Sequence, residues 1–319
     1  MASNERTARW PARLHVVTGK GGTGKTTVAA ALALALAEGG RRTLLVEVEG
    51  RQGIAQLFGI PPLPYAERRV AGVPGGGEVR ALAVDPEEAL LEYLDMFYKL
   101  GAAGRALRKV GAIDFATTIA PGLRDVLLTG KVKEATTRSR EGRRVYDAVV
   151  LDAPPTGRIG RFLNVTAETA RLAKVGPIKS QSEGVASLLR SPITAVHVVT
   201  LLEEMPVQES LDAITELGSL HIPVGRIILN ATQPALLTAA KVTKAELKRG
   251  LSAAGLPADA GAVSGLAAEA RAHLTRRRLE ESLRTELTET GRPMVELPLL
   301  DRGVDRSGLE ELADRLMSG

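Results

Sequence analysis

The sequence predicts an α/β protein with a doubly wound, mostly parallel sheet of about seven or eight strands. Short apolar runs recur along the 319 residues, and most lack the polar alternation of a half-exposed strand. Stretches of helical length separate these runs, as parallel βαβ units require. A glycine-rich turn joins the first run to the first helical stretch, which places a ligand site at the carboxyl end of the sheet.

The elements can be assigned in chain order. The strand candidates are Leu14–Thr18, Thr43–Val48, Val79–Val84, Ala148–Asp152, Ala195–Thr200, Arg226–Asn230 and Met294–Leu297. The apolar stretch Val28–Ala37 is shorter than the ~18 residues of a membrane span and predicts a buried helix. The Pro/Gly-rich passage Gly59–Gly77 predicts a loop. The last helix, Ser307–Met317, has leucines at helical spacing beside mixed charges, so we expect it to pack on the sheet.

Two connections are too long for simple crossovers. Asp85–Glu141 has room for two or three helices between successive strands, and Ile159–Ser191 is a second long connection. We therefore expect one domain over residues 1–319, with a helical subdomain inserted from about 86–142 and 160–190. This subdomain would stand on one edge of the sheet.

Composition excludes several kinds of site. Cysteine is absent, which rules out disulfides, thiolate zinc sites and thiolate binding of metalloids. The four histidines are too scattered for a metal site. No signal-peptide core opens the chain, so we expect a cytoplasmic protein. The net charge is +5, and the basic clusters Lys131–Arg144 and Arg271–Arg278 have almost no aromatic residues beside them. We expect solvated surface there, and nucleic acid is not an expected partner.

The glycine-rich turn has the pattern of a phosphate-binding loop. Gly19, Gly24, Lys25 and Thr26 satisfy G-x-x-x-x-G-K-[ST] between a strand and a helix. Its glycines let successive backbone N–H groups point at phosphate oxygens, and the helix adds its positive end. Lys25 would neutralise the β and γ oxygens, and the Thr26 hydroxyl would ligate Mg²⁺. The predicted nucleotide-binding residues of the loop are Gly19, Gly21, Gly22, Thr23, Gly24, Lys25, Thr26 and Thr27, with ATP and Mg²⁺ as cofactors.

Acidic residues follow two of the predicted strands. An acid at the carboxyl end of a strand faces the ligand crevice of an open α/β sheet. Glu49 would orient or deprotonate the attacking water as a catalytic residue. Glu47 and Asp152 would hold Mg²⁺ through water.

The motifs carry a family resemblance. A second lysine, Lys20, gives the loop the form K-G-G-x-G-K-[ST], which resembles the deviant-Walker (SIMIBI) group of P-loop proteins. In that group this lysine reaches the phosphates of a partner subunit, which implies a catalytic role for Lys20 beside Lys25. Asp152-Ala-Pro-Pro-Thr-Gly157, with the nearby Arg-Phe-Leu, is similar to the second switch of the ArsA and guided-entry (GET) ATPases.

The resemblance implies further roles. Gly157 would offer its N–H to the γ-phosphate, Asn230 would recognise the base, and Pro298 and Leu299 would pack on the adenine. Matches fall between residues 13 and 301 and are weakest over Ala231–Gly291.

Departures from the family pattern limit which properties of the family are expected for this chain. Glu49-Gly50 stands where the family usually has Asp-Pro, so the carboxylate is displaced by about one bond and turnover is expected to be slow or conditional. The intersubunit C-x-x-C zinc site of eukaryotic guided-entry members cannot exist here. Arsenite pumps usually carry two fused ATPase halves, whereas this chain has one phosphate loop. The partner is therefore expected to be a second copy of the chain or a paralogous subunit.

The leading hypothesis is a dimeric Mg-ATP switch that hydrolyses ATP and couples it to a protein client or membrane partner. Leu90–Leu100 holds three of the nine aromatic residues, and it fits either core packing or a client groove. A peripheral membrane location stays open. One alternative is a positioning ATPase like the partition or septum-site proteins, although a basic C-terminal amphipathic helix is missing. Others are an ATP-binding regulatory subunit with weak hydrolysis, and a small-molecule kinase or ligase, for which no substrate pocket is identified.

Overall fold

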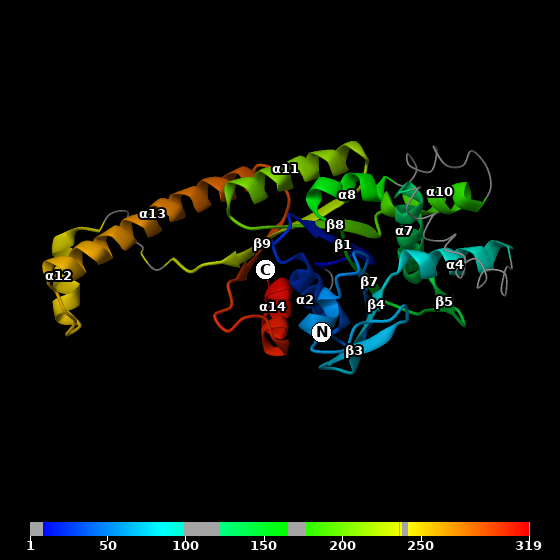
Figure 1. The fold of residues 1–319 in the computed structure, drawn as a ribbon, viewed down its shortest axis with the longest axis horizontal. Helices are drawn as coiled ribbons and strands as arrows, with labels where there is room; N and C mark the ends of the chain where they lie inside the picture. Colours follow the sequence, from blue (N-terminus) through cyan, green and yellow to red (C-terminus); the bar gives the residue numbers. More distant parts are fainter. Residues whose placement is uncertain (1–8, 99–120, 165–176, 236, 238–241, 319) are drawn as a thin grey trace.

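An eight-stranded sheet forms the centre of the computed structural model, which describes residues 9–98, 121–164, 177–235, 237 and 242–318 (Figure 1). The strand order is β10-β9-β8-β1-β7-β2-β4-β3. All pairings in this sheet are parallel except that of β3 with β4, which confirms the predicted fold class. The strands are β1 Leu14–Gly19, β2 Arg42–Glu47, β3 Arg68–Val73, β4 Gly77–Ala83, β7 Ala148–Asp152, β8 Thr194–Thr200, β9 Val224–Thr232 and β10 Met294–Pro298.

Strand β3 corrects one expectation. It lies inside Gly59–Gly77, where the sequence predicted only a loop, and it pairs antiparallel with β4 at the edge of the sheet. Only Ala71 of this strand is buried, and Arg68 and Arg69 are exposed. An edge strand of this kind has no continuous apolar run, so the pattern that revealed the buried strands did not mark it. A second small hairpin joins β5 Ser139–Arg140 to β6 Arg143–Arg144.

Helices cover both faces of the sheet. Alternate residues of each central strand belong to different cores: Leu14 and Val16 pack in one, and Val17 packs in the other. Because both faces are buried, these strands are apolar along their whole length. The first core includes residues of α4 Pro86–Tyr98, α7 Pro121–Thr137, α8 Thr156–Leu163, α10 Pro177–Leu189 and α11 Glu204–Ser219. The second includes residues of α2 Lys25–Ala37, α3 Gly53–Leu57 and α14 Arg306–Ser318.

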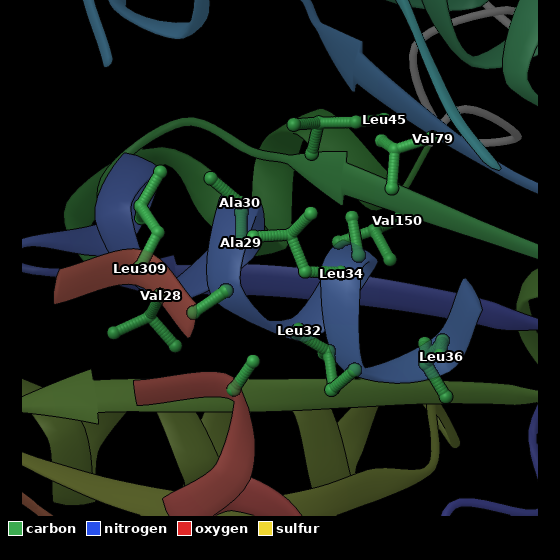
Figure 2. Packing of buried hydrophobic residues seen from close by; sticks show 14 of the residues in the cluster. Val28, Ala29, Ala30, Leu32, Leu34, Leu36, Leu45, Val79, Val150 and Leu309 are labelled. Atoms are coloured by element: carbon green, nitrogen blue, oxygen red, sulfur yellow. The ribbon is translucent and has the colours of Figure 1, made fainter. Parts of the chain in front are cut away.

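Helix α2, which follows the phosphate loop, is enclosed on all sides. Every residue from Val28 to Ala37 is at most 2 % exposed, and the helix packs between the sheet and α14 (Figure 2). Leu309, Leu312 and Leu316 of α14 are also buried in this core. Both predicted helices are therefore confirmed. Since α2 cannot move without opening the core, the loop that it anchors has a rigid support.

The long connections are helical where the structure describes them. Helix α7 packs against both α4 and α10, at the end of the molecule shown on the right of Figure 1. Leu90 and Tyr93 of α4 are buried, which favours core packing for the first part of Leu90–Leu100. The side chains of Met96–Leu100 lie outside the described residues. The proposed subdomain over 86–142 and 160–190 stays a prediction, because 99–120 and 165–176 are not described.

A helical arm extends from the opposite end of the sheet. It consists of α12 Lys244–Ala253 and the 29-residue helix α13 Ala260–Thr288 (Figure 1). At the base of the arm, Leu283 and Leu287 pack against β9 and α11 residues. The sequence predicted only solvated basic surface at Arg271–Arg278 in this region, and a projecting helix was not among the predicted elements.

Candidate functional site

The phosphate loop spans the turn between β1 and α2, as predicted. A side chain at Gly19 would collide with the carbonyl oxygen of Val199 on β8. Gly24 has a φ of 86°, and a side chain there would collide with the amide of Asn230. The backbone N–H and the hydroxyl of Thr23 both donate to the carbonyl oxygen of Lys20, at 3.3 and 2.9 Å. Gly19 is thus required by the close approach of the β8 backbone, and Gly24 is required by its left-handed conformation beside the Asn230 side chain.

Behind the loop, Thr26 meets Asp152. Its hydroxyl donates to Asp152 Oδ2 at 2.7 Å, because β1 and β7 are paired and Asp152 lies opposite Val17. The other oxygen, Asp152 Oδ1, is buried and has no hydrogen-bond partner. Burial raises the pKa of Asp152 to about 6, although the Thr26 hydroxyl and the nearby Lys25 lower it. A buried carboxylate oxygen without a donor is unfavourable unless a cation or water meets it.

This pair fits a magnesium site. Mg²⁺ prefers oxygen ligands and is usually held by one or two protein groups, with phosphates and water completing its shell. The Thr26 hydroxyl and Asp152 Oδ1 are oxygen atoms beside the phosphate loop that could act as metal ligands. Within the described residues, no group of three or more His, Cys, Asp or Glu side chains is arranged to hold a metal. The protein thus offers a partial ligand set that a nucleotide would complete.

The two glutamates after β2 have different surroundings. Glu47 is buried, and its carboxylate accepts the backbone N–H groups of Gly53 and Ile54, at 3.3 and 3.4 Å. It therefore holds the start of α3 close to the loop. Glu49 is 17 % exposed and lies between the guanidinium groups of Arg51 and Arg158, each at 3.7 Å. Sequence reasoning missed both arginines, because neither belongs to a recognised motif.

The signature lysine has a partner inside its own chain. Lys20 Nζ lies 2.8 Å from Glu209 Oε1 on α11, and the Thr156 hydroxyl donates to Glu209 Oε2 at 3.1 Å. The hydrogen bond from Lys20 lowers the pKa of the Glu209 carboxyl. Glu209 thus links the phosphate loop to the start of α8. Glu209 was not predicted from the sequence, because it is one of several acids on an ordinary amphipathic helix.

The predicted second switch runs beside the loop. The Thr18 hydroxyl donates to the carbonyl oxygen of Pro154 at 2.7 Å, and Ala153 N–H donates to Val17 at 2.9 Å. Gly157 lies in the first turn of α8, with open space where a side chain would project. That space leaves its backbone approachable.

Two of the three predicted base-recognition residues meet at a pocket of about 530 Å³, and Pro298 is not among its lining residues. Asn230 and Leu299 both line it, together with residues of α13. The Asn230 amide donates to the carbonyl oxygen of Thr23 at 2.8 Å, so the pocket adjoins the phosphate loop. Pro298 ends β10, and Leu299 N–H donates to Thr232 at 2.9 Å.

Comparison with known proteins identifies the family. Residues 12–190 match the family profile described as "Anion-transporting ATPase", and this match covers the phosphate loop and the second switch. The chain belongs to the anion-transporting ATPase family. The resemblance to the ArsA and guided-entry ATPases is thereby confirmed.

Relatives of the anion-transporting ATPase family extend the match beyond residue 190. ATPase BagA of Mycobacterium tuberculosis (strain ATCC 25618 / H37Rv) is 54 % identical over 96 % of this chain and 94 % of its own length. ATPase GET3 of Kluyveromyces lactis is 26 % identical over 67 % of this chain and 70 % of its own. The arsenical pump-driving ATPase of Acidiphilium multivorum is 25 % identical over 68 % of this chain and 39 % of its own.

Membership in the anion-transporting ATPase family implies that the loop takes ATP. The roles of the individual residues in nucleotide binding and hydrolysis stay predictions. No helix in the described ranges is both long and apolar enough to cross a membrane.

Proposed function

We propose that this protein is an ATP-hydrolysing molecular switch that works as a dimer with Mg-ATP between or beside its subunits. The observation that carries the proposal is the pair formed by Thr26 and Asp152, whose second carboxylate oxygen is buried without a partner next to the phosphate loop. Such an oxygen suits the cation that accompanies a triphosphate.

Each residue has a role in this proposal. Backbone N–H groups of the loop and the Lys25 ammonium would hold the phosphates. Thr26 would ligate Mg²⁺ directly, since a hydroxyl that donates to Asp152 keeps its oxygen lone pair for a cation. Asp152 would hold the ion through water, and Glu47, whose oxygens already bind the α3 backbone, would contribute in the same way. Glu49 would place the attacking water.

The dimer is proposed from Lys20. In the single chain this lysine forms an ion pair with Glu209 at partial exposure, where such a pair contributes little. A partner's triphosphate is a stronger acceptor than one carboxylate, so Lys20 would exchange Glu209 for that phosphate as the subunits close. The partner would be a second copy of the chain or a paralogous subunit.

We further propose that this cycle is coupled to a protein client or a membrane partner and that the protein is cytoplasmic. Both are supported by likeness to proteins named ATPase GET3 and arsenical pump-driving ATPase. The positioning-ATPase alternative is disfavoured, because the apolar side of α14 is already buried against α2. The regulatory alternative, with weak hydrolysis, draws support from Glu49, which lies between two arginines.

The test measures Mg-ATP hydrolysis and oligomeric state together for the wild type, Lys25→Ala and Lys20→Ala. We expect the wild type to release phosphate and to form dimers with Mg-ATP, in a mass-photometry measurement. Lys25→Ala should bind ATP poorly, whereas Lys20→Ala should bind it and fail to hydrolyse it. Full turnover by Lys20→Ala, or hydrolysis by a wild type that stays monomeric, would contradict the shared site.

A further inference from the structure

Two exposed leucines face one pocket from different elements. Leu279 on α13 is 40 % exposed, and Leu299, in the turn after β10, is 51 % exposed. Of the six large apolar side chains that are exposed in the described part of the chain, these two line the pocket of about 530 Å³. Its volume is within the range of ~300–1,000 Å³ that small ligands occupy. Water contact with both leucines is unfavourable, so an apolar ligand between them would gain free energy on binding.

The pocket is continuous with the phosphate loop through Asn230. The carbonyl oxygen of Thr23 can only accept a hydrogen bond, so Asn230 must turn its Nδ2 toward it. Asn230 Oδ1 is therefore the atom left to meet a ligand, and it selects a donor. The exocyclic amino group of adenine is such a donor, whereas guanine presents a carbonyl oxygen at the same position.

We propose that α13 supplies the second wall of the base subsite, with Leu279 covering the face of the adenine that Leu299 does not cover. This inference rests on the proposed ATP site and adds a helix that lies outside the matched family region, residues 12–190. Near Leu279, Arg277 and Glu280 form an ion pair at 3.1 Å within the pocket lining. Glu280 is thus neutralised, and it does not repel the nucleotide.

The proposal connects nucleotide occupancy to the arm. Leu283 and Leu287 already fix the base of α13 against the sheet, and Leu279 lies one turn farther out. A base held against Leu279 would fix that turn as well. The position of the arm would therefore respond to the base of the nucleotide and not to its phosphates alone.

The experiment compares Leu279→Ala with Leu266→Ala, a matched control. Leu266 lies on the same helix, is 36 % exposed and does not line the pocket. Calorimetry with Mg²⁺ would give the Kd of ATP and of inorganic tripolyphosphate, which has no base. We expect Leu279→Ala to weaken ATP binding by about five- to tenfold and to leave tripolyphosphate binding unchanged. Leu266→Ala should match the wild type with both ligands.

Hydrogen exchange gives a second readout on unmodified protein. We expect ATP, but not tripolyphosphate, to slow exchange in α13 around residues 276–284. Equal ATP affinity of Leu279→Ala and the wild type, or equal protection of α13 by both ligands, would overturn the α13 inference and leave the proposed function intact. A wild-type chain that binds no ATP would overturn the proposed function itself.

Discussion

At the carboxyl ends of β2 and β7, three acids near one loop have different environments. Asp152 keeps a buried oxygen without a donor, Glu47 has both oxygens on backbone N–H groups, and Glu49 is the most exposed. These differences decide which acid is available to a water molecule. The Glu49 carboxylate lies 3.7 Å from each of two guanidinium groups, which is longer than a hydrogen bond, so Glu49 is the acid that we expect to turn toward an attacking water.

We therefore expect Glu49→Gln to lower the hydrolysis rate by about 10²–10⁴-fold and to change ATP affinity little, because a general base acts in the transition state. Single-turnover phosphate release and equilibrium ATP binding would check this expectation. Glu49→Asp serves as the control that restores a carboxylate. Wild-type turnover by the Gln variant would assign water activation to another group.

A second residue-scale feature is the buried pair of His15 and His197. Arg226 N–H donates to His197 Nδ1 at 3.1 Å, which leaves the His197 proton on Nε2, 3.1 Å from His15 Nδ1. His15 then carries its proton on Nε2, 2.9 Å from the carbonyl oxygen of Ala12. Trp10 packs edge-on against His197. Burial lowers the pKa of His15 to about 4 and lowers that of His197 as well.

The depressed histidine pKa values predict loss of stability in acid. Unfolded histidine titrates near 6.5, so the unfolded chain binds more protons than the folded chain between pH 6.5 and about 4. Above pH 6.5 this histidine pair should not make the free energy of unfolding depend on pH. It should fall by on the order of 3 kcal/mol as the pH approaches 4.

Urea unfolding at several pH values would measure this dependence. His15→Gln should be less stable at pH 8 and should show a flatter slope from pH 6.5 to 4. The exposed His221, changed to Asn, is the control. A wild-type slope in His15→Gln would mean that other groups cause the acid sensitivity.

At the scale of elements, Glu209 joins three segments. It lies on α11 and binds Lys20 in the phosphate loop and Thr156 at the start of α8. These are the segments that the proposed cycle requires to move, because Lys20 must reach a partner and α8 begins at the second switch. The contact therefore opposes closure in the single chain.

We expect Glu209→Gln to strengthen ATP-dependent dimerisation by up to about fivefold, the range that a partly exposed ion pair allows. Analytical ultracentrifugation at several protein concentrations would measure the dimer Kd. Asp212→Asn removes one negative charge from the same helix and should leave the Kd unchanged. Weaker dimerisation of Glu209→Gln would show that Glu209 supports closure.

At the scale of the whole molecule, the chain has one phosphate loop and one signature lysine, so a complete site requires two chains if Lys20 acts across the interface. Mixing two inactive variants tests this arrangement. Lys20→Ala keeps an intact loop, and Lys25→Ala keeps the lysine that a partner's loop needs. In a homodimer, one of the two sites of each mixed pair would be complete.

We expect a one-to-one mixture to regain on the order of a quarter of the wild-type hydrolysis rate, since about half of the dimers are mixed and each has one working site. Phosphate release from the mixture and from each variant alone would be compared. Absence of recovery would exclude a homodimer with a lysine donated in trans and would favour a paralogous partner.

The sequence by itself determined the buried sheet and the phosphate loop of this protein. Continuous apolar runs marked seven of the eight strands of the main sheet, because strands covered on both faces cannot alternate. The loop was determined for a similar local reason: Gly24, Lys25 and Thr26 act through their own backbone and side chains. Asp152 was found because it ends an apolar strand at the ligand-binding edge of the sheet, whereas Asn230 was predicted from the family resemblance.

Only the tertiary structure decided the contacts between distant segments. Edge strand β3 has too few buried residues to leave a pattern. Glu209 and Leu279 are ordinary helix residues until the fold places them beside the phosphate loop and the pocket that adjoins it. The buried pair of His15 and His197 depends on β1 and β8 being neighbours. The physical reason is common to all of these: their energies come from partners far away in the chain, and local sequence does not encode which partners meet.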